Sequence, residues 1–475
     1  MDQSPAIVWF RQDLRLNDNP ALAAAAASGR PILPVYVLDD ESAGEFRRGA
    51  ASRWWLHQSL DALNRSLEGQ MLFLAGDAAA ILPRLVRESG ARAVYWNRCY
   101  EPWRIDRDRR IKADLEGIDV DVETFNASLL FEPWTVLKAD GTPYRVFTPF
   151  FRKGCLLSPA QPADPEPAAR LGEFAKPPLK GALDDLALIP PIGWYESFAE
   201  TWSPGEAGAR EKLDAFMDIG IRNYKEGRNY PDLPHVSRLS PHLHFGEISP
   251  REVWHAGNLA KASQALETDA DHFQSELGWR EFSYYLLYHF PQLPRSNLQS
   301  KFDAFPWVED PEALAAWQRG STGVPIVDAG MRELWNTGYM HNRVRMIVAS
   351  FLVKNLLIHW HHGERWFWDT LLDADLANNS ASWQWVAGCG ADAAPYFRIF
   401  NPVTQSHKFD PDGAYVKRFV PELSALPAKH LHAPWEAPES LLKDAGIVLG
   451  EHYPEPIVDL KDSRERALEA FRSLS

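Results

Sequence analysis

The sequence predicts a two-domain protein, an α/β domain followed by an all-α domain, with a long proline-rich connector between them. Three observations carry this prediction. Short apolar runs alternate with helical segments over the first 130 residues, prolines cluster between Ser158 and Trp194, and strand signals nearly vanish after that cluster. A chain of 475 residues with 45% apolar content can build two such cores. We expect the α/β domain over residues 1–130, the connector over 131–195 and the helical domain over 196–475.

The first domain shows alternating strand and helix signals. Ala-rich or amphipathic stretches at residues 19–28 and 51–67 indicate helices between short apolar runs. This βαβ order predicts a parallel sheet covered on both faces. The glycine loops G-x-G-x-x-G and G-x-x-x-x-G-K do not occur, so a dinucleotide is not expected to bind this sheet in the usual way. We expect the run from Phe10 to Asn19 to serve the sheet edge and the domain interface. The predicted strands span residues 6–10, 31–39, 71–76, 93–98 and 120–125.

The connector and the second domain differ in proline content and periodicity. Eight prolines between Ser158 and Trp194 oppose both helix and ladder formation, so we expect an extended chain laid over a surface. Beyond it, residues 208–224, 269–290 and 339–360 carry apolar side chains at three- and four-residue spacing. The second domain is therefore predicted to be all helical.

Composition excludes several classes of protein. No run approaches the roughly 20 apolar residues of a membrane span, and the N-terminus lacks a basic start and a cleavage site, so we expect a cytoplasmic protein without a membrane partner. Cys99, Cys155 and Cys389 lie too far apart for a disulfide framework or a four-cysteine cluster, and we expect no metal. The net charge of −14 argues against a general nucleic-acid coat but allows a local basic groove.

Two serine–proline pairs predict helix starts in the second domain. In "VSRLSPHLHFGEISPREVW", Ser240 and Ser249 are each suited to cap a helix whose first residue is proline. Free backbone N–H groups beside Ser237 and Arg238 would suit a phosphate. Capped helix starts are also common structural features, so this segment alone is weak support for a ligand.

One motif places an acid beside an indole. Glu276 and Trp279 are three residues apart in "FQSELGWREF" and therefore neighbours on one helix face. A carboxyl held against an indole can have its pKa raised and so keep a proton to donate. Without further context, an ordinary amphipathic helix is the better interpretation of this spacing.

Another motif begins an apolar helix with polar residues. Asn342, Arg345 and Met346 share one face of the helix predicted after Gly338, while Arg343 turns sideways. An Arg and an Asn on such a face indicate a buried polar site, because unpaired they would be costly.

The stretch "DADLANNSASWQWVAGCGADAAPYFRIFNP", residues 373–402, supplies partners for that polar site. Asp373 and Asp375 are candidates to pair with Arg345, and Asn379 is a candidate to present its amide to a ligand. The two tryptophans of the stretch, two residues apart, point to different sides of a helix. One could line a pocket while the other leads away from it, but packing in the core is at least as consistent with the spacing.

These motifs resemble those of the photolyase/cryptochrome flavoproteins, and within that family the bacterial repair enzymes for cyclobutane pyrimidine dimers. The similarity runs through nearly the whole chain, in order, from "VWFRQDLRLNDNPAL" through "SRLSPHLHFGEIS", "ELGWREF" and "GYMHNRVRMIVASFLVK" to the stretch at residues 373–402. It implies a Rossmann-like α/β domain for an antenna chromophore and an all-α domain that binds folded FAD. The absence of a glycine fingerprint agrees with this expectation.

The resemblance also implies roles for the cofactor-binding residues. Residues matching those that hold the FAD phosphates are Tyr224, Val236, Ser237, Arg238, Leu239 and Ser240. Residues matching those around the isoalloxazine and ribityl chain are Asn342, Arg345, Asp373, Asp375 and Asn379, of which Asn379 faces flavin N5.

Further positions match the family's lesion site and electron route. The family implies light-driven electron transfer from reduced FAD to a flipped pyrimidine dimer in UV-damaged DNA, with Glu276 bonding a dimer carbonyl. Trp279 and Trp385 would pack against the dimer, and Met346 would line the same pocket. Positions around the lesion are Arg228, Arg280, Asn342, Arg343, Arg398 and Gln405, and a tryptophan chain for photoreduction is Trp383, Trp360 and Trp307.

Two other functions within the family fit the sequence less well. Plant cryptochrome photoreceptors typically carry Asp facing N5 and a long disordered tail, whereas this chain has Asn379 and ends at "RERALEAFRSLS". Repair of (6-4) photoproducts uses histidines where this chain has Asn342 and Met346. The resemblance therefore favours repair of cyclobutane dimers by a monomeric enzyme.

The antenna chromophore stays open at this point. Folate-binding relatives carry an Asn–Glu pair shortly after "YE", where this chain has Trp103 and Arg104. The alternatives are methenyltetrahydrofolate stacked on aromatic residues, a deazaflavin, or an empty antenna site.

Overall fold

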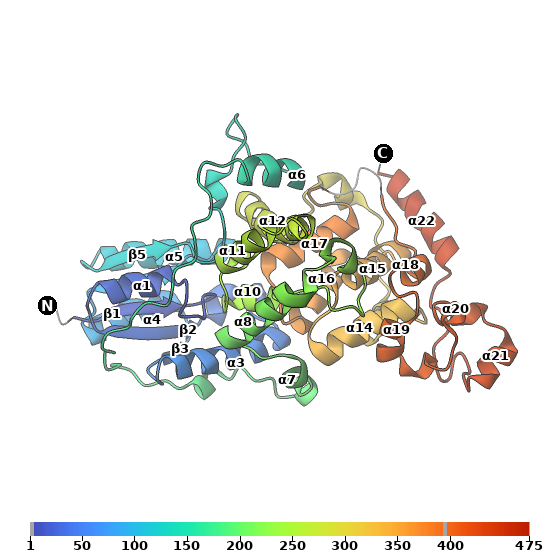
Figure 1. Cartoon of the computed structure of the whole chain (residues 1–475), viewed down its shortest axis with the longest axis horizontal. Helices are drawn as coiled ribbons and strands as arrows, with labels where there is room; N and C mark the ends of the chain where they lie inside the picture. The colour runs from blue at the N-terminus through green and yellow to red at the C-terminus, as the bar shows by residue number, and fades with distance from the viewer. Residues whose placement is uncertain (1–3, 393–396, 475) are drawn as a thin grey trace.

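The structure is a computed structural model that describes residues 4–392 and 397–474. A domain built on one sheet forms one end of the molecule and a larger helical domain forms the other (Figure 1). No described helix is both long and apolar enough to cross a membrane.

The first domain contains one five-stranded parallel sheet. Its strands are β1 (Ala6–Phe10), β2 (Ile32–Leu38), β3 (Leu72–Ala75), β4 (Ala93–Asn97) and β5 (Asp121–Phe125), in the order β3-β2-β1-β4-β5. Central β1 pairs with both β2 and β4, so that Ile7 lies opposite Leu33 on one side and Val94 on the other. Every residue of β1 and β2 is buried, as expected for a parallel sheet covered on both faces.

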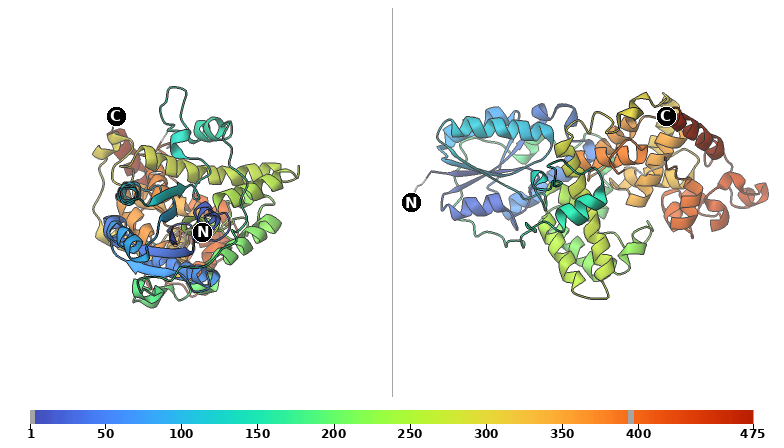
Figure 2. Two further views of the ribbon diagram at one scale, coloured as in Figure 1. Left: turned by 90° about the vertical axis from the view of Figure 1, so that its left-hand side faces the viewer. Right: turned by 90° about the horizontal axis from the view of Figure 1, so that it is seen from above.

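Helices cover both faces of the sheet, as the βαβ order predicts (Figure 2). α1 (Pro20–Ala27) and α3 (Ala50–Ser66) pack against the face that carries Val8 and Phe10. α4 (Ala78–Ser89) and α5 (Pro102–Glu116) pack against the opposite face, which carries Trp9. Alternation along the strands thus divides the apolar residues between two cores.

The segment between the domains is partly helical. α6 (Phe147–Pro149) continues as a π-helical turn at residues 150–155, a helical piece within the predicted connector. Beyond it the described chain has no helix up to the short 3₁₀ turns at Leu183–Leu186 and Gly193–Tyr195. It runs along the first domain: the N–H of Ile32 donates to Glu173 O, and the N–H of Ala175 donates to Ile32 O.

The described residues of the second domain form helices joined by loops, with one isolated bridge between Leu449 and Tyr453. The predicted helix over 339–360 is broken, because a π-helical turn at 351–355 ends its first part and Leu357 has a φ of +56°. The helices are α7 (Phe198–Thr201), α8 (Glu206–Ala215), α9 (Tyr224–Gly227), α10 (Ser240–Phe245), α11 (Pro250–Lys261), α12 (Glu267–His289), α13 (Pro311–Arg319), α14 (Pro325–Thr337), α15 (Asn342–Ser350), α16 (Trp360–Thr370), α17 (Leu376–Ala387), α18 (Pro402–Phe409), α19 (Ala414–Phe419), α20 (Ala428–Leu431), α21 (Glu439–Asp444) and α22 (Leu460–Arg472).

The segment that follows β1 contacts the helical domain. The guanidinium of Arg15 donates to Gly246 O at 2.9 Å, and the N–H of Leu14 donates to Phe245 O at 3.1 Å. Gly246 has a φ of +69°, and a Cβ there would lie 2.1 Å from the carbonyl oxygen of Gln12. Only glycine permits this approach of the two backbones. The run from Phe10 to Asn19 therefore lies at the domain interface, as expected.

Candidate functional site

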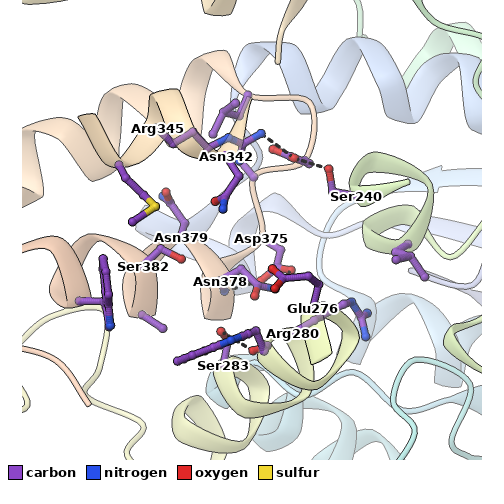
Figure 3. Close-up of a pocket in the computed structure, with 18 of the residues that line it drawn as sticks. Ser240, Glu276, Arg280, Ser283, Asn342, Arg345, Asp375, Asn378, Asn379 and Ser382 are labelled. Atoms are coloured by element: carbon purple, nitrogen blue, oxygen red, sulfur yellow. Dashed lines mark hydrogen bonds and ion pairs between the residues drawn. The ribbon is translucent and has the colours of Figure 1, made fainter. Parts of the chain in front are cut away.

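A cavity of about 520 Å³ lies inside the helical domain and gathers most of the predicted site residues (Figure 3). Its walls come from α10, α12, α15, α16 and α17. Predicted residues that line it are Tyr224, Arg228, Ser237, Leu239, Ser240, Glu276, Trp279, Arg280, Asn342, Arg345, Met346, Asp373, Asp375, Asn379, Trp383 and Trp385.

A charged cluster occupies one side of the cavity. Arg345 Nη2 lies 2.8 Å from Asp373 Oδ2, which also accepts the hydroxyl of Ser240 at 2.5 Å. The Arg345 Nε donates to Met340 O at 2.7 Å, which fixes the guanidinium. Asp373 Oδ1 is buried without a hydrogen-bond partner among the described residues. A buried carboxylate oxygen without a partner is costly, so this oxygen is suited to a ligand donor.

The structure corrects the predicted role of Ser240. The residue that precedes α10 is Leu239, and Ser240 is the first residue of the helix, so it is not the N-cap. Its hydroxyl bonds Asp373 from a distant part of the chain, and this contact replaces the local cap. Ser249 does cap α11, where it and Glu252 form a capping box.

The two aspartates of the stretch at 373–402 have different partners. Asp373 pairs with Arg345 as predicted, but pairing of Asp375 with Arg345 is wrong. Asp375 is the N-cap of α17 and accepts both the N–H and the side-chain amide of Asn378, at 2.7 and 2.6 Å. Burial raises the pKa of Asp375. Asp375 therefore determines where α17 begins.

A hydrogen bond to α16 holds the side-chain amide of Asn379 in place. Its Nδ2 donates to the backbone oxygen of Glu364 on α16, at 3.0 Å. Glu364 is buried and its carboxylate accepts the hydroxyl of Ser380, while burial raises the pKa of Glu364 to about 7. The α16–α17 contact thus fixes the orientation of the amide that faces the cavity.

The α12 wall carries Glu276, Trp279 and Arg280, as the three-residue spacing predicted. Glu276 forms an ion pair with Arg228, which was not predicted from the sequence. The acid therefore has a cation beside it as well as the indole of Trp279 in the same cavity wall. Arg280 Nη1 donates to Ser128 O at 2.7 Å and so connects α12 to the end of the first domain.

The two tryptophans of α17 differ in environment. Trp383 is 2% exposed and its ring centroid lies 5.0 Å from that of Phe367. Trp385 is half-buried, and its indole Nε1 donates to Asp392 O at 3.2 Å. Both line the cavity, one from the core and one from the rim.

Seven predicted residues lie away from the described cavity lining. Arg238 has a φ of +53° and its guanidinium lies over the Tyr339 ring. Arg343 turns sideways as predicted, where it bonds Asn229 and lies 4.4 Å from the centroid of Phe409. The others are Val236, Trp307, Trp360, Arg398 and Gln405.

Two of these residues form an aromatic cluster outside the cavity. The ring centroid of His359 is 4.9 Å from that of Trp307 and 5.6 Å from that of Trp360. Trp360 Nε1 donates to Asn297 Oδ1 at 3.0 Å. The two indoles of the predicted electron route are therefore joined by one imidazole.

Several lining residues were not found from the sequence. Asn378 directly precedes Asn379 and donates its side-chain amide to Asp375. The Asn–Asn pair in the sequence is the signal that could have identified it. Glu364 supports the cavity without lining it and belongs to no recognisable motif. Others that line it are Ser283, Tyr339, Phe367, Leu371 and Ser382. In the described part of the chain no group of three or more His, Cys, Asp or Glu side chains is placed to hold a metal ion.

Comparisons with known proteins agree with this geometry. Residues 6–168 match the family model "DNA photolyase", and residues 273–473 match "FAD binding domain of DNA photolyase". A deoxyribodipyrimidine photo-lyase of Agrobacterium fabrum is 50% identical over 99% of this chain and 98% of its own. Cryptochrome-1 of Arabidopsis thaliana is 39% identical over 99% of this chain and 70% of its own.

The structural comparison gives the same result. The crystal structure of a bacterial class III photolyase from Agrobacterium tumefaciens superposes with a TM-score of 0.95 at 49% identity, covering 100% of this chain and 98% of that one. The predicted fold class is confirmed, and the chain belongs to the photolyase/cryptochrome family.

Proposed function

We propose that this protein is a deoxyribodipyrimidine photo-lyase, which uses light and reduced FAD to split cyclobutane pyrimidine dimers in DNA. One observation carries the proposal. A single cavity joins an Arg345–Asp373 pair with Asn379 on one side to a wall of acid and indoles, Glu276 and Trp279, on another. The first set suits a cofactor, and the second suits a planar, polar-edged substrate.

The lining residues fit a flavin dinucleotide. A volume of about 520 Å³ lies within the usual range for cofactor sites. The free oxygen of Asp373 offers an acceptor, the amide of Asn379 is held in place, and Phe367 and Leu371 supply apolar surface. FAD, bound in its reduced form, would supply the light-excited electron donor. Residues proposed to hold it are Tyr224, Val236, Ser237, Arg238, Leu239, Ser240, Asn342, Arg345, Asp373, Asp375 and Asn379.

The α12 wall is proposed to receive the damaged bases. A dimer is weakly paired and stacked, which lowers the cost of flipping it out of the duplex. The protonated carboxyl of Glu276 would donate a hydrogen bond to a dimer carbonyl, exchanging its contact with Arg228 for a contact with the substrate. The indoles of Trp279 and Trp385 would cover the bases, beside Met346.

Arginines near the cavity are proposed to bind the phosphates around the lesion. The chain carries a net charge of −14, so binding depends on a local concentration of cations. Residues proposed for the DNA surface are Arg228, Arg280, Asn342, Arg343, Arg398 and Gln405. Trp383, Trp360 and Trp307 are proposed to carry electrons to the cavity from the protein surface, supported by the aromatic contacts around His359.

A second candidate function is blue-light reception, and one observation favours it: a plant cryptochrome is 39% identical over 99% of this chain. The two functions share FAD and differ in the need for a DNA lesion. The geometry favours repair, because Glu276, Trp279 and Trp385 converge on one cavity beside a cofactor-type site.

The deciding experiment is a repair assay on the purified holoprotein. Oligonucleotides carrying a cyclobutane dimer or a (6-4) photoproduct are incubated under blue light and in darkness. We expect light-dependent repair of the cyclobutane dimer alone. Failure to repair either lesion, with normal FAD content, overturns the proposal and favours a receptor.

Two variants separate the proposed roles. Glu276→Ala should retain FAD but lower the repair yield by about tenfold, because a hydrogen bond to a charged group contributes about 1.5–3 kcal/mol. Trp383→Phe should leave repair by prereduced enzyme nearly unchanged and block photoreduction of oxidised FAD. Normal photoreduction by Trp383→Phe contradicts the proposed electron route.

A second chromophore and the assembly state complete the proposal. An archaeal photolyase from Sulfolobus tokodaii, 29% identical to this chain, has a crystal structure described "with two FAD molecules: Implication of a novel light-harvesting cofactor". We propose that this chain also carries an antenna chromophore and acts as a monomer. The absorption spectrum of the purified protein distinguishes methenyltetrahydrofolate from a deazaflavin or a flavin, and light scattering gives the mass.

A further inference from the structure

Trp279 and Trp385 line the cavity from two different helices, α12 and α17. Asp392, which lies outside both helices, contacts Trp385 directly and Trp279 through Phe147. Trp385 Nε1 donates to the backbone oxygen of Asp392 at 3.2 Å. The carboxylate of the same residue accepts the N–H of Phe147 at 3.3 Å. Asp392 lies beyond the end of α17, and Phe147 begins α6, which lies beside α12 (Figure 1). Asp392 therefore connects both walls.

Phe147 in turn fixes Trp279 by stacking. Their ring centroids are 3.9 Å apart with an interplanar angle of 10°. The Phe151 ring also stacks with Phe147, with centroids 5.5 Å apart and an interplanar angle of 12°. Because Phe147 covers one face of the Trp279 indole, a ligand in the cavity would meet the rest of that side chain.

The stack is supported by the backbone of α12. A Cβ on Gly278 would lie 2.6 Å from Cδ2 of the Phe151 ring. The glycine beside Trp279 therefore allows Phe151 to approach the helix closely. Phe147 is buried at 9% exposure and also contacts Phe282 edge-on, so it has little freedom to move away from Trp279.

The backbone at Asp392 has an uncommon conformation. Its φ of +53° lies in the left-handed region, where Asp is tolerated better than most residues. Such conformations often mark positions where the surrounding contacts determine the geometry. Here a hydrogen bond to the distant α6 and one to the neighbouring α17 provide those contacts.

We propose that Phe147 and Asp392 are positioning residues that fix the separation of Trp279 and Trp385, and thereby give the cavity its preference for a stacked pair of bases over a single undamaged base. This inference rests on the proposed function. Holding both indoles in place before binding removes the cost of ordering them when the lesion enters. Neither residue lines the cavity itself.

Dark binding measures this role directly. The holoprotein is titrated with an oligonucleotide carrying one cyclobutane dimer and with the same oligonucleotide undamaged. For Phe147→Leu we expect the ratio of the two affinities to fall by about two- to tenfold, since a stacked aromatic pair is stabilised beyond its burial. FAD absorption should not change. KM for the dimer should rise while kcat at saturating substrate changes little, the signature of lost binding.

Substitutions at Asp392 separate its side chain from its backbone. Asp392→Gly keeps the left-handed backbone and the oxygen that bonds Trp385, but loses the bond to Phe147. We expect the affinity ratio to fall several-fold, and Asp392→Asn to restore it because the amide oxygen still accepts the N–H. Phe471→Leu is the matched control: Phe471 stacks on Phe397 at 4.6 Å and 8°, away from the cavity lining.

The outcomes distinguish this inference from the proposed function. If the unmodified protein prefers the dimer and both Phe147→Leu and Asp392→Gly keep that preference, the inference is wrong and the function stands. If Phe147→Leu does not fold, Asp392→Gly decides alone. If the unmodified protein shows no preference and no repair, the proposed function fails and this inference fails with it. An equal loss in Phe471→Leu also overturns the inference, because it would indicate a general loss of stability.

Discussion

The carboxyl edge of the sheet and the cavity of the helical domain both contain Arg, Asp and Trp side chains, but these side chains have different surroundings in the two places. At the sheet edge Arg11 lies 2.8 Å from Asp108 and its guanidinium is 4.1 Å from the Trp9 centroid, while Arg107 pairs with Asp39 at 3.1 Å. The charges of Arg11, Arg107, Asp39 and Asp108 pair with one another, and the two atoms of this cluster that have no hydrogen-bond partner among the described residues, Arg11 Nε and Trp9 Nε1, are buried inside the domain. In open α/β sheets this edge is where a ligand usually binds.

In the cavity the incompletely paired groups line open space. Asp373 bonds Arg345 through one carboxylate oxygen and leaves the other without a partner in the described structure. Asn379 and Glu276 are held by single neighbours and line open space. Clusters of Arg, Asp and Trp therefore indicate a binding site only where the structure leaves polar groups facing a cavity.

The largest loss of stability is expected for a substitution at the sheet edge. Asp108→Ala leaves the buried Arg11 and Arg107 without their shared partner, which should lower the free energy of unfolding by about 3–5 kcal/mol. Urea denaturation measures the change, and the folded variant should still retain FAD. Asp106→Ala on the same helix is the control, because the Asp106–Arg109 pair is exposed and its loss should change little. Equal effects of the two substitutions would contradict the distinction.

The second-largest expected effect is on the pH dependence of stability, which should have opposite signs for Asp108 at the sheet edge and Glu364 behind the cavity. Burial would raise the pKa of Asp108, but Arg11 and Arg107 lower it, so its contribution is lost as the pH falls. Burial raises the pKa of Glu364 from about 4.5 to about 7. The folded protein then holds one more proton than the unfolded chain between these values, and stability falls as pH rises across that window, by at most about 1.4 kcal/mol per unit.

Glu364→Gln tests that sign. The substitution removes the titrating group while keeping an acceptor for Ser380, so the decline of stability between about pH 4.5 and 7 should become shallower. Denaturation midpoints across this range give the slope. Because burial also raises the pKa of Glu281 to about 7, part of the decline should persist, and Glu281→Gln should reduce it further. If the slope of stability against pH is unchanged in both variants, the pKa values of Glu364 and Glu281 are not raised in the folded protein.

Overpacking behind the cavity should have a smaller effect. A Cβ on Gly363 would lie 2.1 Å from Cη2 of Trp383, so Gly363→Ala must displace the indole. We expect a loss of about 1–3 kcal/mol of stability and slower photoreduction of FAD. Gly172→Ala, where nothing lies within 4 Å, is the matched control. Normal photoreduction with a destabilised Gly363→Ala would remove Trp383 from the electron route.

The smallest effect on stability is expected within the cavity itself. Asp373→Asn keeps the shape but removes the charge that pairs with Arg345, so stability should change by less than the sheet-edge variant. FAD retention should fall by about tenfold, because a hydrogen bond to a charged group contributes about 1.5–3 kcal/mol. Equilibrium dialysis measures retention. Full retention by Asp373→Asn would show that this carboxylate does not contact the cofactor.

Much of the fold could be predicted from local patterns. The five apolar runs became five parallel strands, because residues buried on both faces of a sheet are apolar throughout. The three-residue spacing placed Glu276 beside Trp279 on α12. Prediction failed in opposite ways at two residues. Ser240 bonds the distant Asp373 and is not an N-cap, whereas Asp375 caps α17 locally and does not bond the distant Arg345.

The sequence by itself determined the two-domain order, the parallel sheet, the helical domain, and the face of α15 that carries Asn342 and Arg345. These follow from periodicity and burial, which act along the chain. Only the tertiary structure decided that Arg228 reaches Glu276, that Phe147 stacks on Trp279, and that Asp392 joins two walls of one cavity. Contacts between residues more than forty positions apart depend on how whole elements pack, and no local pattern records them.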